Sequence, residues 1–189
     1  MTPQPLQLPF DVGITLDPGE TVQRIVYQSW VALLPTVLGA VVLELFALGL
    51  GYAVNHMPEL IPFPLSVVVA MVGVTSVLAA LILLIGLYVY RHNVLIFTSI
   101  HLICVEQVGL FGRRVSQLNF RNVEDVTGKK AGLFATLFNY GDVTVQSAGE
   151  QEKFIFHYAP DPTQIADDAL RQHEICLRSA TSGVDGSPE

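Results

Sequence analysis

The residue types that most often carry chemistry are present in this sequence, but they form no catalytic motif. His173-Glu174 lacks the second histidine of a zinc-binding H-E-x-x-H helix. The sequence also lacks a nucleophile elbow, a phosphate-binding loop and a dinucleotide fingerprint. Three further histidines are scattered over separate predicted strands or strand ends: His92, His101 and His157. A metal or acid–base cluster of these histidines is the alternative to ordinary structural roles.

Cys104 and Cys176 have no metal-type or C-x-x-C spacing. They are typical of small buried hydrophobic residues in a reducing compartment. We therefore predict no catalytic residue, no cofactor and no metal, and a protein that is not an enzyme.

One carboxylate, Glu44, falls near the middle of a long apolar run, where insertion scales give a cost of about 2.5–3.5 kcal/mol. No Lys, Arg or His in the next apolar run can pair with it. One interpretation is a protonated Glu44 that is hydrogen-bonded to Thr75 or Ser76 on an opposing helix. A second is a polar contact with a transmembrane helix of another protein or of a second copy. A proton relay is the third.

The elements that must position Glu44 are two nearly charge-free runs, residues 31–54 and 65–90. Each exceeds the roughly 20 residues that a helix needs to cross a bilayer, so we predict a transmembrane hairpin over residues 30–90. Its turn, residues 55–64, contains three prolines and no Lys or Arg. Because Arg24 precedes the first run and Arg91 follows the second, the positive-inside rule places both termini in the cytosol.

Composition agrees with a membrane protein, since only 14% of the residues are charged and the mean hydropathy is +0.48. The formal net charge of −7 argues against nucleic acid as a partner. Residues 1–29 are predicted to be a tail and a juxtamembrane segment. In that segment, Val22, Ile25 and Val26 would lie on one side of a helix.

After Arg91, apolar and polar residues alternate in short runs bounded by turn residues, which predicts antiparallel strands. The predicted strands cover residues 94–97, 100–106, 115–120, 122–126, 142–146 and 153–157. A helix then begins with Asp161 as N-cap and Pro162 at its first position. From Ser179 on, the composition predicts a disordered tail, residues 179–189.

A sheet of about six or seven antiparallel strands capped by a C-terminal helix resembles a pleckstrin-homology-like (PH-like) barrel. The whole sequence resembles bacterial membrane proteins that join two N-terminal transmembrane helices to a PH-like domain. The residues that carry the resemblance are Pro18–Glu20, Trp30, Val108–Gly112, Leu118–Val126, Leu137–Val143, Ala148-Gly149 and Pro160–Leu170. The resemblance implies a cytosolic PH-like domain at residues 91–178 and a multi-pass protein of the bacterial plasma (inner) membrane. It implies no catalytic residue.

Two surface features of this domain are candidate contacts. One is a set of basic residues that could face lipid headgroups or a partner, or simply be solvated: Arg113, Arg114, Arg121, Lys129 and Lys130. The predicted first hairpin at residues 98–100 lacks the basic motif of phosphoinositide-binding PH domains, so specific inositide binding is not expected. The other is the apolar stretch 132–138, which predicts a short helix packed over the barrel. Alternatively, Phe134 and Phe138 dip into the membrane interface or dock a partner.

These features predict a non-enzymatic, membrane-anchored PH-like interaction module. It would be an accessory or scaffold subunit that binds another membrane protein, or a second copy, at the cytosolic face. The alternative is a sensor of anionic lipid, in which the basic residues bind headgroups. Protection against envelope stress is suggested only by the family resemblance.

Overall fold

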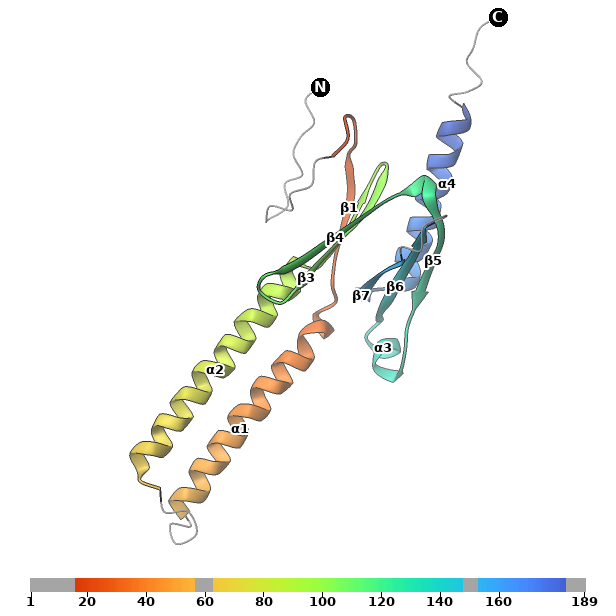
Figure 1. Cartoon of the computed structure of the whole chain (residues 1–189). Helices are drawn as coiled ribbons and strands as arrows, with labels where there is room; N and C mark the ends of the chain where they lie inside the picture. Colours follow the sequence, from red (N-terminus) through yellow and green to blue (C-terminus); the bar gives the residue numbers. More distant parts are fainter. Residues whose placement is uncertain (1–15, 57–62, 148–152, 183–189) are drawn as a thin grey trace, which may run out of the picture. The chain divides into compact units, whose positions relative to one another are not determined.

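A computed structural model describes residues 16–56, 63–147 and 153–182, with the backbone alone for 179–182 (Figure 1). The chain divides into two compact units: residues 32–90 form one, and the segments before and after them form the other. Several predicted features lie outside the described residues. These are most of the N-terminal tail, residues 57–62 of the first turn, the Ala148-Gly149 turn and residues 183–189.

The first unit is an apolar helical hairpin. A short 3₁₀ helix (η1, Trp30–Leu33) leads into α1 (Leu34–His56), and α2 (Leu65–His92) returns antiparallel to it. Glycines let the helices approach closely, because a Cβ on Gly86 would lie 2.5 Å from Thr36 Cγ2. By length and composition both helices could cross a membrane, with mean hydropathies of 2.3 and 2.8 over their most apolar stretches.

The second unit contains seven antiparallel strands in two sheets. The first sheet has the order β1-β2-β3-β4: β1 (Val22–Tyr27), β2 (Val94–Thr98), β3 (His101–Val108) and β4 (Gly112–Asn119). A 3₁₀ turn (η2, Phe120–Asn122) leads to the second sheet, ordered β5 (Val123–Lys129), β6 (Tyr140–Ser147) and β7 (Lys153–Pro160). A short helix, α3 (Leu133–Leu137), joins β5 to β6.

The core of this unit lies between the inner faces of the two sheets and the C-terminal helix α4 (Pro162–Ser182), which packs against β5, β6 and η2. Its largest fully buried side chains include Phe120, Phe156 and Ile165. The two sheets and the capping helix are consistent with the predicted PH-like fold, but the sheets do not close into a barrel.

The predicted helix at residues 20–29 is wrong, because this segment is strand β1 and pairs with β2. A bulge between Val22 and Arg24 shifts the register. It therefore breaks the strict alternation that would have marked a strand, and leaves apolar residues at a helix-like spacing. Once paired, Val26 enters the core while Val22 and Ile25 pack on the other face of the first sheet.

The C-terminal helix also differs from its prediction at one end. It begins at Pro162, directly after Asp161, as expected, but it continues through residues 179–182, which were assigned to a disordered tail. The first residue that disfavours a helix strongly is Gly183, so nothing in the sequence ends the helix at Ser179.

Candidate functional site

The five basic residues predicted as one candidate surface are all exposed, but they do not form a single patch. Arg113 and Arg114 lie at the start of β4, whereas Arg121 comes two residues after its end, so about 20 Å of strand lies between them. Lys129 ends β5 and Lys130 follows it, and Lys130 Nζ already lies 2.5 Å from Asn139 Oδ1 and 3.6 Å from Asp161 Oδ1. Arg121 is therefore separated from Arg113 and Arg114, and Lys130 is already engaged within the domain.

Glu44 has a partner inside the hairpin. The Ser76 hydroxyl donates to Glu44 Oε1 at 2.7 Å, while the Thr75 hydroxyl donates to the carbonyls of Met71 and Val72 in its own helix. Glu44 Oε2 is buried and has no hydrogen-bond partner among the described residues. Of the two expected partners, the structure thus brings only Ser76 to the carboxyl group.

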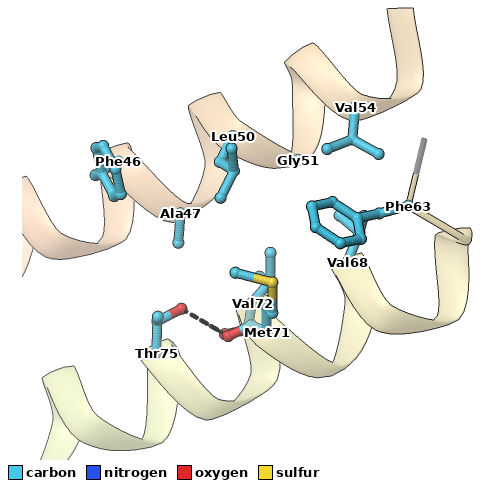
Figure 2. Close-up of a pocket in the computed structure, with 10 residues that line it drawn as sticks. All are labelled: Phe46, Ala47, Leu50, Gly51, Val54, Phe63, Val68, Met71, Val72 and Thr75. Carbon is cyan, nitrogen blue, oxygen red and sulfur yellow. Dashed lines mark hydrogen bonds between the residues drawn. The ribbon is translucent and has the colours of Figure 1, made fainter. Parts of the chain in front are cut away.

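A small cavity of about 60 Å³ lies between α1 and α2, toward their turn (Figure 2). Apolar side chains such as Phe46, Phe63 and Met71 line it, and the hydroxyl of Thr75 is turned to its own helix. A dry cavity of this size offers no polar path through the hairpin.

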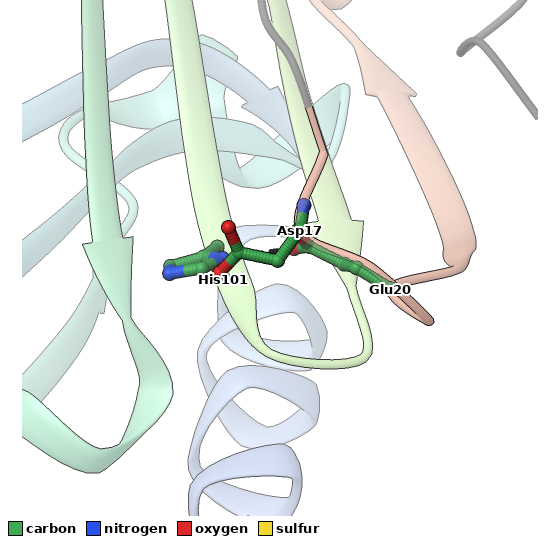
Figure 3. A group of neighbouring side chains, drawn as sticks. All are labelled: Asp17, Glu20 and His101. Atoms are coloured by element: carbon green, nitrogen blue, oxygen red, sulfur yellow. Dashed lines mark hydrogen bonds and ion pairs between the residues drawn. The ribbon is translucent and has the colours of Figure 1, made fainter. Parts of the chain in front are cut away.

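Asp17, Glu20 and His101 meet where β1 begins, with ligand atoms within 4.8 Å of one another (Figure 3). The Glu20 side chain is fully buried. Its Oε2 accepts from the backbone N–H of Asp17 at 2.9 Å, and its Oε1 lies 2.9 Å from His101 Nδ1 and accepts from the Thr98 hydroxyl. Because both oxygens are already used, we interpret the group as a latch between the turn at Gly19 and the β2–β3 turn.

The pKa of Glu20 reflects this latch. Burial raises the pKa of the carboxyl group, but the hydrogen bonds from Thr98, Asp17 and His101 outweigh burial and hold the pKa below its usual range. The carboxylate is therefore ionised and structural at neutral pH. Glu20 was singled out in the sequence only as one of the residues that carry the family resemblance, and its burial depends on strand β1, which was not predicted.

Both cysteines are buried free thiols. Burial raises the pKa of the Cys104 thiol to about 12, with a further contribution from Glu106, and burial also raises that of Cys176. Cys176 Sγ donates to the carbonyl of Ser99 at 3.4 Å. Both thiols are protonated core groups at neutral pH.

The apolar stretch at residues 132–138 forms the predicted short helix, but it is not packed over the sheets. Only Ala135 is buried, while Leu133, Phe134 and Leu137 are 79%, 66% and 70% exposed. The Phe138 ring makes an edge-to-face contact with Trp30, their centroids 5.4 Å apart. The structure therefore disagrees with packing over the sheets. It leaves the apolar side chains of α3 available for contact with the membrane interface or with a partner.

A polar groove of about 300 Å³ runs between β1, at the edge of the first sheet, and α4. Arg24 and Asp168 form an ion pair across it at 2.5 Å. Its remaining lining is formed by Gln23, Phe97, Arg171 and Gln172. Sequence reasoning missed this groove, because it exists only once β1 is a strand.

Hydrogen bonds hold the chain segments that connect the strands to the apolar helices, at Ser29 and at Asn93. Asn93, buried between α2 and β2, accepts from the Gln107 N–H at 2.5 Å and donates to Gln28 Oε1 at 3.3 Å. The Ser29 N–H donates to the carbonyl of Tyr158 at 2.7 Å. Both chain connections to the hairpin are thus tied to the same end of the sheets.

A family model described as Bacterial PH domain matches residues 31–173, which includes both apolar helices and most of α4. The chain belongs to the bacterial PH domain family. The match treats the hairpin and the strands after it as one family unit, and β1 lies before the matched residues. Comparisons with curated proteins and with solved structures find no matching protein.

Membership assigns this bacterial PH domain to a class of modules that generally bind rather than catalyse. Several ionisable side chains have structural contacts, such as Glu20 with His101 and Arg24 with Asp168. Among the described residues, the surfaces open to a ligand include the polar groove and the exposed apolar side chains.

Proposed function

We propose that this bacterial PH domain is a non-catalytic, membrane-anchored binding module that acts as an accessory or scaffold subunit for another membrane protein. The observation that carries the proposal is the pairing of β1 with β2. Tyr27 lies opposite Val94 in the sheet, and the chain between these neighbours is the apolar hairpin. The hairpin is therefore inserted between two paired strands of the module, and the chain joins each of its two helices to the module.

The surface of the hairpin supports its insertion in a bilayer. Apolar side chains on both helices are largely exposed, for example Leu38 at 60%, Phe46 at 72% and Leu84 at 63%. In water this surface would be a severe aggregation hazard, whereas lipid tails accommodate it. The basic residues near the ends of the hairpin favour a cytosolic PH domain and an external turn.

The polar groove between β1 and α4 supports a protein partner. Its lining includes charges of both signs and two amides, which suits a polar peptide segment more than a lipid tail. Because Arg121 lies apart from Arg113 and Arg114, and Lys130 is already engaged with Asp161, the five basic residues give less support to the alternative of an anionic-lipid sensor. We place the partner's contact at Arg171 and its neighbours in the groove.

Cysteine labelling of intact cells tests the anchoring. A membrane-impermeant maleimide should label His56→Cys, next to the turn, in intact cells, and should label Asp125→Cys only after lysis. The parent chain is the background control, because its two thiols are buried. Labelling of Asp125→Cys in intact cells would reverse the orientation, and recovery of the chain in the soluble fraction would overturn anchoring.

Native mass determination after gentle detergent extraction tests the partner. A stoichiometric partner that is lost with Arg171→Glu supports binding in the groove. Loss with Glu44→Leu instead would place the contact within the membrane. If the parent chain, Arg171→Glu and Glu44→Leu all run alone, the accessory-subunit proposal fails.

A further inference from the structure

The PH-like unit has two apolar protrusions that its own core does not use. One is the β3–β4 turn, where Phe111 is 98% exposed and Val108 and Leu110 are 68% and 45% exposed. The other is α3, which exposes Leu133, Phe134 and Leu137. We call these six residues the apolar rim. Single exposed apolar residues are ordinary, but two groups of large ones indicate a contact surface.

Strand register locates the first protrusion. Val94, the first residue of β2, pairs with Val105 of β3, so residues 106–108 extend past the point where the chain enters from α2. Three residues of strand span about 10 Å, and the turn with Phe111 extends further. Asn93 fixes this arrangement through its bond to the Gln107 N–H. The β3–β4 turn is therefore at the end of the sheet that is joined to the apolar helices.

A ring contact locates the second protrusion at the same end. Trp30 begins η1, at the start of the first apolar segment, and its ring meets Phe138 directly after α3. Tryptophans that flank membrane helices sit at the level of the headgroups. The contact with Phe138 therefore holds the end of α3 next to Trp30, which is two residues before the first residue of the apolar unit.

We propose that the apolar rim is a lipid-contacting surface, which embeds in the boundary between the headgroups and the acyl chains of the membrane that α1 and α2 cross. This inference rests on the proposed membrane anchoring. Exposed basic residues adjoin both protrusions, Arg113 and Arg114 beyond Phe111 and Lys129 before α3. Apolar tips bordered by basic side chains fit an interface, where the tips enter the apolar layer and the charges remain among headgroups.

The lipid is favoured over a protein as the occupant because both protrusions are tied to residues adjoining the apolar helices. The consequence is a PH domain held on the bilayer by the rim as well as by the hairpin. Its polar groove, between β1 and α4, would then keep one orientation toward neighbouring proteins.

Fluorescence quenching in vesicles tests the inference with the full chain. Trp30 is the single tryptophan, so Trp30→Phe provides a background in which Phe111→Trp or Leu137→Trp reports on one protrusion at a time. The chain is reconstituted at high dilution in vesicles of zwitterionic lipid brominated near the headgroup end of the acyl chains. Both variants should be quenched about as strongly as Trp30 in the parent chain.

The matched control is Ile175→Trp in the same background, since Ile175 is also exposed (53%). It lies one residue from Cys176, which bonds to Ser99 in the β2–β3 turn at the opposite end of the sheet. This variant should show little quenching. If Phe111→Trp and Leu137→Trp are quenched no more than Ile175→Trp, the rim does not contact lipid and the inference is overturned. Failure of the chain to float with the vesicles would instead overturn the anchoring itself.

Discussion

At the scale of single residues, Glu20 is a buried polar group that joins two turns of the fold. Its buried carboxylate joins the turn before β1 to Thr98 and His101 at the β2–β3 turn. We expect Glu20→Gln to lower the free energy of unfolding at neutral pH by about 1.5–3 kcal/mol, the range for hydrogen bonds to charged groups. Thermal unfolding of the full chain in mild detergent measures this loss.

The same residue predicts a pH dependence. Because the folded pKa of Glu20 is lowered, its stabilisation is fully present above the unfolded value of about 4.3. It is then lost as the pH falls through the folded pKa. Glu20→Gln should therefore flatten the acid limb of the stability curve, whereas Glu124→Gln, at an exposed position, should leave it unchanged. Equal acid limbs for all three chains would show that the latch carries no charge-dependent stability.

At the scale of elements, the corner between β5, β6 and α4 tolerates no added side chain. A Cβ on Gly128 would lie 2.2 Å from the carbonyl oxygen of Pro162, and this backbone cannot move without displacing the start of α4. We expect Gly128→Ala to cost about 2–3 kcal/mol or more in unfolding free energy. The measurement is again thermal unfolding. Gly73→Ala is the control, because a Cβ there meets no atom within 4 Å, and a comparable loss in this variant would contradict the argument.

The helices and strands also show which parts of the fold can be predicted from local sequence patterns and which cannot. The apolar helices, the six strands after Arg91 and the start of α4 follow from hydropathy, alternation and capping residues, which are local properties. Strand β1 and the exposure of α3 do not, because each depends on partners far along the chain. Pairing with β2 overrides the helix-like spacing of Val22, Ile25 and Val26, and no local pattern shows whether Phe134 is covered.

The candidate site, like the fold, could be predicted from the sequence only in part. The sequence singled out Glu44 and Ser76, and the structure adds the hydrogen bond between them. It also singled out five basic residues, but their division between the ends of β4 and the region after β5 depends on the path of the chain. The Trp30–Phe138 contact joins residues 108 positions apart, and the hydrogen bond between Asn93 and Gln28 bridges the whole hairpin, so neither was visible in the sequence.

At the scale of the whole molecule, the pairing of β1 with β2 means that the hairpin is an insertion between two adjacent strands. Tyr27 and Val94 lie opposite each other, so a short loop can replace everything between Ser29 and Asn93. We expect a chain of residues 1–29 joined through Gly-Gly to residues 93–189 to fold without the hairpin. Circular dichroism and a cooperative thermal transition in the absence of detergent would measure that outcome.

The matched variant lacks β1 as well, and consists of residues 93–189 alone. Without β1, the hydrogen-bonding edge of β2 is unpaired and Val26 no longer covers part of the core, so this variant should aggregate or fail to unfold cooperatively. If residues 93–189 fold as well as the joined chain, β1 is dispensable. The PH-like unit would then begin after the second apolar helix, and the hairpin would be a simple N-terminal anchor and not part of the folding unit.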